Sequence, residues 1–159
     1  MILCLLGTNP YDFSRLAKAV DELAKDLEED VVIQLGNTKY IPKYCKYFDF
    51  ASKNEIEKLM KEADIVITQG GYGSMTDAII LNKKVIAVPR LQKLKEAQDN
   101  QVELVEYYDS KGYVKACFDV NELKDFIKKI REKKIVFKPY ENENIKKIST
   151  LIKEYIYEN

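Results

Sequence analysis

Three glycines and a serine stand between an apolar run and a helical pattern in the middle of the chain. The segment ITQGGYGSM places Gly70, Gly71 and Gly73 directly before Ser74. The apolar run before this glycine turn (residues 70–73) predicts a buried strand, and the pattern after it predicts a helix that begins at Ser74. Backbone N–H groups and the helix dipole make such a turn attractive to anions. The residues therefore predict a site for a diphosphate, such as that of a nucleotide or nucleotide sugar.

The glycine turn also has a purely structural interpretation. It matches neither the GxGxxG fingerprint of dinucleotide binding nor a phosphate-binding loop with its lysine. Glycines that adopt positive φ where a strand passes into a helix would explain the same residues. Ser74 fits both interpretations, because an N-cap and a phosphate contact use the same end of the helix. Three glycines in four residues favour phosphate binding.

Asp77 lies one turn into the predicted helix. A carboxylate at this place can accept hydrogen bonds from the two hydroxyls of a ribose. It can equally be an acidic residue that stabilises the positive end of the helix dipole. The sequence alone does not separate these two roles.

Other polar residues follow further apolar runs, and each has a structural alternative. Thr8 and Asn9 could donate hydrogen bonds to a phosphate or a sugar, or could simply shape the turn before Pro10. Arg90 could fix a phosphate or a base, or could be an exposed loop arginine.

Two side-chain amides lie near the start of a later helical pattern. Asn100 and Gln101 are adjacent in the segment QDNQVEL. Amides on a surface are often only solvated, but the position of these two near the expected ligand edge favours a contact with a ligand.

Short apolar runs alternate with amphipathic patterns along the whole chain. The predicted strands are Ile2–Leu6, Val31–Leu35, Tyr47–Phe50, Asp64–Thr68, Val85–Val88 and Tyr113–Cys117. The predicted helices are Asp12–Glu29, Ser52–Glu62, Ser74–Leu81, Glu96–Ser110, Glu122–Arg131 and a tail helix at about 141–157. Ser52 is expected to be the N-cap of its helix, with Glu55 completing a capping box. This alternation predicts a single α/β domain over residues 1–159, with a Rossmann-like parallel sheet covered by helices on both faces.

The sheet would bring the candidate residues together. Ligands of open parallel sheets bind beyond the carboxyl ends of the strands. The segments Gly7-Thr8-Asn9, Thr68–Ser74 and Pro89-Arg90 all follow predicted strands and should meet at that edge.

The composition excludes several classes of function. The chain has 26 basic and 26 acidic side chains, so no net charge attracts it to nucleic acid. It contains no histidine, which removes the usual Ser-His-Asp and Cys-His mechanisms. The three cysteines, without a CxxC spacing, predict neither a disulfide framework nor a zinc site, and they indicate a reducing compartment such as the cytoplasm. No DxD run or carboxylate cluster calls for a metal ion, and no apolar run reaches membrane-spanning length.

The quoted motifs together resemble a known family. The segments LLGTNPYDF, VVIQLGNTKYIP and ADIVITQGGYGSMTDAIILNKKVIAVPR, followed by DNQVEL, are similar to the nucleotide-sugar-binding half of glycosyltransferases with two facing Rossmann-like domains. The chain resembles small stand-alone versions of that half. These are the catalytic subunit of the two-subunit transferase that adds GlcNAc to dolichol-diphosphate-GlcNAc, and bacterial exopolysaccharide transferase subunits. The C-terminal domain of the peptidoglycan lipid II transferase is a more distant relative.

The resemblance also implies roles for individual residues. The family's acidic ribose ligand, commonly a glutamate, falls on Asp77. The family's His-Gln pair appears as Asn100-Gln101, and Gln101 would face the donor sugar. The family's two loops beside the sugar diphosphate fall on Gly7, Thr8, Gly70, Gly71, Gly73 and Ser74.

What the resemblance implies is half of an enzyme. The chain would bind a UDP-sugar, UDP-GlcNAc or a related hexose donor, for transfer to a lipid-linked acceptor, with no cofactor and no metal ion. The facing domain usually supplies the acceptor site and the general base, so a membrane-anchored partner subunit would carry both and recruit this cytoplasmic chain to the inner face of the membrane. The tail helix at 141–157 could dock onto that partner, or could close the sheet of its own domain. The alternative function is a non-catalytic, nucleotide-binding regulatory module.

Overall fold

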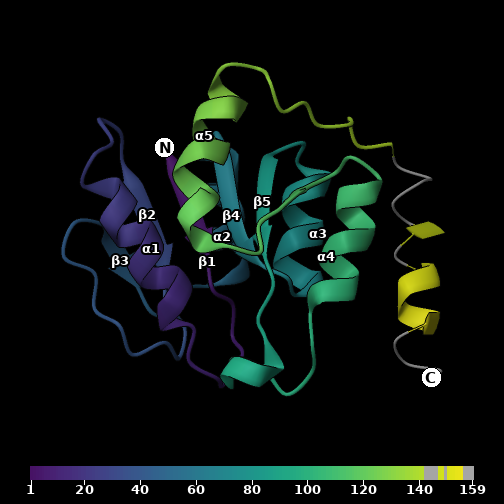
Figure 1. The fold of residues 1–159 in the computed structure, drawn as a ribbon, viewed down its shortest axis with the longest axis horizontal. Helices are drawn as coiled ribbons and strands as arrows, with labels where there is room; N and C mark the ends of the chain where they lie inside the picture. Colours follow the sequence, from purple (N-terminus) through teal and green to yellow (C-terminus); the bar gives the residue numbers. More distant parts are fainter. Residues whose placement is uncertain (142–146, 149, 156–159) are drawn as a thin grey trace.

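A six-stranded sheet organises the chain, with every neighbouring pair of strands parallel and the strand order β3-β2-β1-β4-β5-β6 (Figure 1). The computed structural model describes residues 1–141, 147–148 and 150–155. The strands are β1 (Ile2–Leu5), β2 (Val31–Gln34), β3 (Lys46–Phe48), β4 (Ile65–Gln69), β5 (Lys84–Val88) and β6 (Lys115–Ala116). The Rossmann-like parallel sheet expected from the sequence is confirmed.

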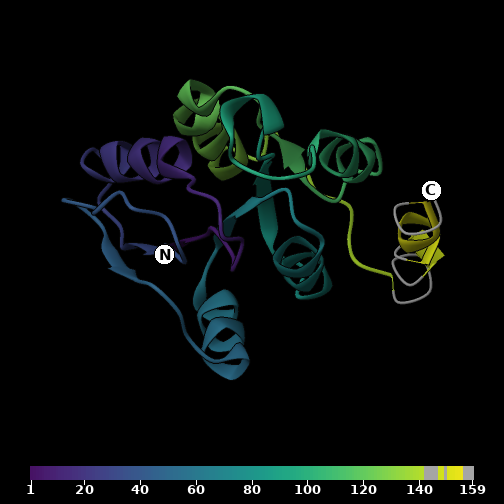
Figure 2. The same ribbon diagram turned by 90° about the horizontal axis from the view of Figure 1, so that it is seen from below.

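Helices cover both faces of this sheet, which Figure 2 shows from below. The α-helices are α1 (Ser14–Ala24), α2 (Lys53–Glu62), α3 (Tyr72–Ile80), α4 (Val102–Ser110) and α5 (Leu123–Arg131), and the short 3-10 helices are η1 (Gln92–Leu94) and η2 (Val120–Glu122). Residues of α1 and α5 pack with one face of the strands, and residues of α2, α3 and α4 pack with the other. The sheet is therefore the middle of three layers.

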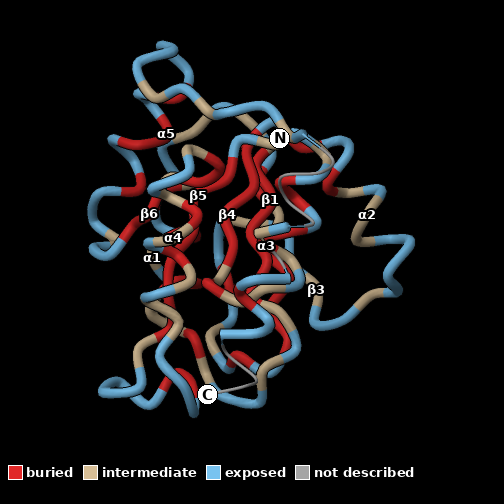
Figure 3. The backbone as a smooth tube through the Cα atoms, turned by 90° about the vertical axis from the view of Figure 1, so that its right-hand side faces the viewer, coloured by how far each residue is buried: buried red, intermediate tan, exposed pale blue. Residues whose placement is uncertain are grey.

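The central strands are apolar at successive positions because both of their faces are buried. In β1, Ile2 and Cys4 belong to the core cluster under α1 and α5, whereas Leu3 and Leu5 belong to the cluster under α2, α3 and α4. Figure 3 shows the resulting band of buried residues along β1, β4 and β5. This burial fixes the strands whose carboxyl ends carry the candidate site.

Several helix boundaries differ from the sequence prediction. Ser52 is the predicted N-cap of α2, and its capping box with Glu55 is confirmed. The helix expected at Asp12–Glu29 is shorter, because tight turns follow Ala24. The helix expected from Glu96 begins only at Val102, because Glu96 is buried and lies outside the helix.

The described part of the tail is helical at residues 147–148 and 150–155, while residues 142–146, 149 and 156–157 of the predicted tail helix lie outside the described residues. Ile152 is 8% exposed and joins the core cluster of α3 and α4, with Ile148 packed against it. The described tail thus packs on its own domain, and its docking onto a partner stays a prediction. No helix in the described part of the chain is long and apolar enough to cross a membrane.

Candidate functional site

The loops that follow β1, β4 and β5 gather at one edge of the molecule (Figure 1). This follows from the parallel register, in which Leu5 lies beside Thr68 and Gln69 lies beside Val88. The first loop (residues 6–13), the glycine turn and the Pro89-Arg90 segment are therefore neighbours. We refer to this as the strand-end edge.

Helix α3 begins at the glycine turn without a side-chain cap. Gly71 is its N-cap, with extended backbone angles (φ −77°, ψ 146°), and Tyr72 is its first residue. The expectation that the helix opens at Ser74 is wrong by two residues, so Ser74 is the third helical residue rather than the N-cap. In contrast to α2 with its complete capping box, no side chain in the described part of the chain accepts a hydrogen bond from the first turn of α3. These N–H groups can donate hydrogen bonds to a bound anion.

The glycines of this turn are not explained by positive φ. The glycines at positive φ are Gly7, Gly36 and Gly112, so the structural alternative proposed for the glycine turn is wrong. Gly70 is required by packing, because a Cβ atom there would lie 2.6 Å from a methyl group of Val105.

Gly73 differs from Gly70 in its surroundings. It is exposed, and a Cβ atom at this position would meet nothing within 4 Å. The fold itself does not require a glycine here. The free space lies at the uncapped turn of α3, where an anion would approach the backbone.

The side-chain amide of Gln69 joins the glycine turn to the first loop. A Cβ atom on Gly71 would lie 2.9 Å from Gln69 Nε2, and one on Gly7 would collide with the same nitrogen. The conformation of Gly7, at φ +77°, is fixed from the other side by Gln34. The Gln34 side chain accepts from Gly7 N at 2.9 Å and donates to Gly7 O at 3.0 Å. Two glutamines thus fix the spacing of the two glycine loops.

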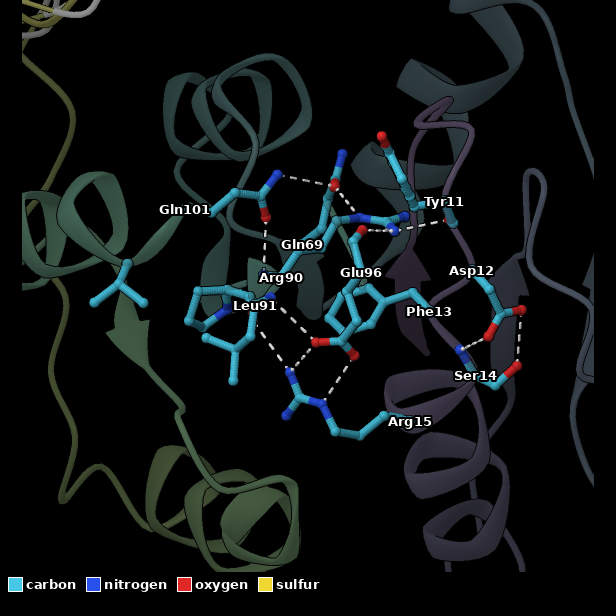
Figure 4. A network of polar contacts seen from close by, with 12 residues as sticks. Tyr11, Asp12, Phe13, Ser14, Arg15, Gln69, Arg90, Leu91, Glu96 and Gln101 are labelled. Carbon is cyan, nitrogen blue, oxygen red and sulfur yellow. Dashed lines mark hydrogen bonds and ion pairs between the residues drawn. The ribbon is translucent and has the colours of Figure 1, made fainter. Parts of the chain in front are cut away.

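Arg90 has a different place from the one expected. It is 1% exposed, so the alternative of an exposed loop arginine is wrong. Its guanidinium donates hydrogen bonds to Gln69 Oε1 at 2.6 Å and to the carbonyl oxygens of Tyr11 and Glu96 at 2.9 and 2.8 Å (Figure 4). It also donates to the carbonyl oxygen of Leu6 at 2.8 Å. Burial lowers the pKa of the Arg90 guanidinium to about 10, which still leaves it protonated at neutral pH. Arg90 stabilises the strand-end edge from the interior. Its guanidinium is directed at groups of the protein and not at a site for a nucleotide sugar.

Glu96 is the acidic residue of this network and forms an ion pair with Arg15. The sequence pattern around it predicts a helix instead. Its carboxylate accepts two hydrogen bonds from the Arg15 guanidinium at 3.0 Å and one from Leu91 N at 3.1 Å (Figure 4). Arg15 also donates to the carbonyl oxygen of Pro89 at 3.2 Å. Helix α1 is thereby tied to the loop after β5.

Gln101 belongs to the same network. Its Oε1 accepts a hydrogen bond from Arg90 N at 3.0 Å, and its Nε2 donates to Gln69 Oε1 at 3.3 Å. The neighbouring Asn100 is exposed, and its side-chain oxygen accepts from Val102 N at 3.2 Å at the start of α4. Gln101 therefore lies at the strand-end edge, half-buried, and its predicted contact with the donor sugar stays a prediction.

Asp77 is exposed on the second turn of α3, within range of the charges of Lys53 and Glu57 on α2. Partial desolvation, with a contribution from the charge of Glu57, raises the pKa of its carboxyl above the usual range, and the charge of Lys53 opposes this shift. No hydrogen bond to this carboxylate is seen within the described residues. A partly desolvated carboxylate of this kind is suited to accept hydrogen bonds from hydroxyl groups. The predicted ribose contact is compatible with this geometry.

The first loop holds the remaining candidates. Asn9 uses its side-chain oxygen to accept from Tyr11 N at 2.9 Å, which is the turn geometry given above as its alternative role. Thr8 is exposed, and its carbonyl accepts from Asn37 Nδ2 at 3.4 Å. Both lie at the strand-end edge, and their contacts with a donor stay predictions.

Several residues that hold this edge together, among them Gln69 and Glu96, were missed by the sequence analysis. Gln69 could have been found as the polar residue that ends an apolar strand directly before the glycine turn. Glu96 gives no such signal, because the segment KLKEAQDN looks like an ordinary charged surface.

The strand-end edge carries polar groups that are exposed or half-buried. Two surface hollows lie elsewhere, one of about 390 Å³ with Lys84 and Phe137 in its lining, and one of about 440 Å³ with Phe48 and Leu59 in its lining. Within the described residues, no group of three or more cysteine and carboxylate side chains could hold a metal ion. The chemistry available at the edge is therefore anion binding by backbone N–H groups and hydrogen bonding by amides and one carboxylate.

Comparisons with known proteins agree with this architecture. The model of the glycosyltransferase family 28 C-terminal domain matches residues 1–155. A search of curated proteins finds no match to the sequence.

Solved structures share the fold at low sequence identity. The solution structure of ALG13 is 18% identical with a TM-score of 0.60, and the match covers 92% of each chain. The crystal structure of Acinetobacter baumannii MurG is 20% identical with a TM-score of 0.54, over 85% of this chain and 42% of MurG. The glycosyltransferase of kitacinnamycin is 15% identical with a TM-score of 0.59, over 78% of this chain and 33% of that protein. The chain thus spans less than half the length of the last two proteins.

Proposed function

The chain belongs to the family of glycosyltransferase family 28 C-terminal domains, and from this premise we propose that it binds the UDP-sugar donor of a glycosyl transfer. The observation that carries the proposal is the uncapped first turn of α3, open to solvent at Gly73 and placed at the carboxyl ends of a parallel sheet. Nucleotide diphosphates bind at this place in open α/β sheets.

The remaining contacts follow from the neighbouring residues. The diphosphate would lie on the N–H groups of Gly73 and Ser74, and the ribose hydroxyls would donate to Asp77. Gly7 and Thr8 would approach the sugar diphosphate from the first loop. Gln101 would face the sugar, which we propose to be N-acetylglucosamine or a related hexose.

This surface would contribute to catalysis by stabilising the leaving group, which is UDP. When the bond between the sugar and the β-phosphate breaks, its electron pair goes to the phosphate oxygen, and the N–H groups and dipole of α3 stabilise that charge. The acceptor hydroxyl must lose a proton at the same time. We assign the general base and the lipid-linked acceptor site to a membrane-anchored partner subunit, because the chain matches a C-terminal domain and covers only 42% of MurG.

A binding experiment tests the donor site. We expect UDP to bind the wild-type chain, and Asp77→Ala to weaken that binding by about tenfold through loss of the ribose contact. Isothermal titration calorimetry measures both affinities, with Asp125→Ala as a matched control because Asp125 is an exposed acidic residue in the first turn of α5. Unchanged affinity of Asp77→Ala would remove the ribose role, and no UDP binding by the wild type would overturn the proposal.

The alternative function, a non-catalytic nucleotide-binding module, requires a transfer assay. The assay combines UDP-GlcNAc, a lipid-linked acceptor and a candidate partner. Transfer that occurs only with the partner supports the subunit proposal. Binding of UDP without transfer to any acceptor, with every candidate partner, supports the module.

A further inference from the structure

The C-terminal helix meets the glycine turn through a lysine. Lys153 Nζ lies 5.3 Å from the centre of the Tyr72 ring, and Tyr72 is the first residue of α3. The neighbouring Ile152 is buried in the core cluster that contains Met75 and Ile79 of α3. The yellow segment in Figure 1 is this helix, on the side of the molecule formed by α3 and α4.

Additional positive charge beside the first turn of α3 would strengthen its hold on a diphosphate. The dipole of a helix supplies only about half an elementary charge, whereas a nucleoside diphosphate carries at least two negative charges. Arg90 does not supply it, because its guanidinium donates to carbonyl groups inside the edge. Lys53 acts on the second turn, beside Asp77.

The side chain of Tyr72 is explained by this contact. Tyr72 lies between two glycines and belongs to neither core cluster, so its ring is not there to fill the interior. An aromatic ring attracts an ammonium group to its face and leaves the N–H groups of that ammonium free on the outer side. The ring therefore holds the Lys153 ammonium beside the turn without neutralising it.

We propose that Lys153 contacts the diphosphate and that the C-terminal helix is thereby part of the donor site. This inference rests on the proposed function. Residues 150–155 should then pack more firmly against α3 when the donor is bound. The phosphates add a charge-assisted contact with Lys153 to the packing of Ile152. A donor without phosphates would not have this effect.

Calorimetry with three ligands tests the charge contact. We expect Lys153→Gln to weaken UDP binding by about tenfold and to leave uridine binding unchanged, because uridine has no phosphate. Lys153→Arg should restore most of the UDP affinity. Lys147→Gln is the matched control, since Lys147 is an exposed lysine of the same helix, and UMP should give an intermediate loss.

Hydrogen exchange tests the coupling to the helix. We expect UDP, but not uridine, to increase the protection of residues 150–155 in the wild type, and Lys153→Gln to lose this increase. UDP affinity of Lys153→Gln equal to that of Lys147→Gln would overturn the inference and leave the donor site intact. Equal losses for UDP and uridine would also overturn it, because they indicate a structural role. Absence of UDP binding by the wild type would overturn the proposed function together with the inference.

Discussion

The Arg90 network and the glycine turn lie side by side at the strand-end edge, yet they are built in opposite ways. Around Arg90, long side chains reach into the interior and donate to carbonyl groups of distant segments. At the glycine turn, three of the four residues are glycines without a side chain, the first turn of α3 has no side-chain cap, and Gly73 faces open space. The first region positions the loops, and the second leaves backbone groups available to a ligand.

This contrast separates residues that stabilise the fold from residues that are available to a ligand. A group that is buried with its hydrogen bonds made is costly to remove, because its partners stay behind without bonds. A group whose partner is a ligand costs little stability when it is changed. Substitutions around Arg90 should therefore change the free energy of unfolding, and substitutions at the glycine turn that remove ligand contacts should change the affinity for UDP.

The largest effect is expected for Arg90→Met. The variant leaves the buried carbonyl groups of Leu6 and Glu96 without their donor, and we expect the free energy of unfolding to fall by about 3–5 kcal/mol. Urea unfolding measures this change. Arg131→Met is the control, because Arg131 is 38% exposed in its pair with Glu29 and should change stability by less than about 1 kcal/mol. Equal effects of the two variants would show that the Arg90 network does not hold the edge.

A pair of glycine substitutions tests the contrast inside the turn. Gly70→Ala places a methyl group 2.6 Å from Val105, and overpacking should lower the free energy of unfolding by about 1–3 kcal/mol. Gly73→Ala meets no atom and should leave stability unchanged or raise it by up to about 1 kcal/mol, since alanine favours a helix. The same methyl group should weaken UDP binding by filling the space at the turn. Urea unfolding and calorimetry on both variants give the comparison, and a stability loss for Gly73→Ala would contradict it.

The smallest effect is expected for Asp77→Asn, and it depends on pH. The pKa of Asp77 is raised above its usual value of 3.8, so the folded protein holds this proton more tightly than the unfolded chain. The free energy of unfolding therefore falls as the pH rises from the usual value through the raised one. Asp77→Asn removes this loss, and we expect it to be more stable than the wild type at pH 7 by about a few tenths of a kcal/mol, because the side chain is largely exposed. Urea unfolding at pH 7 and pH 3 measures the difference, which should disappear at the lower pH; a loss of stability at pH 7 would contradict the raised pKa.

Local sequence patterns predicted most of the fold. The apolar runs predicted the four central strands β1, β2, β4 and β5, because strands buried on both faces are apolar at successive positions. The start of α2 was predicted to the residue, because a capping box involves only Ser52 and its near neighbour Glu55. The start of α4 was missed, because it depends on the pairing of Glu96 with Arg15, 81 residues away.

The candidate site was located by sequence but not understood in detail. The glycine turn lies at the predicted edge, yet Gly70 is a glycine because Val105 packs against it, a contact that no local pattern shows. Arg90 carries no sign in its neighbours that it points inward. Residues whose role depends on distant partners are those that the sequence could not assign.

The hydrogen bonds of Arg90 to residues far earlier in the sequence affect how the chain folds during its synthesis. Its guanidinium joins the carbonyl groups of Leu6 and Tyr11, which are 84 and 79 positions earlier in the sequence. While a ribosome is still making the first half of the protein, those carbonyl groups have no donor from this side chain. The loop after β1 can reach its final form only once Arg90 has emerged, so the strand-end edge should be among the last parts of the nascent domain to become ordered.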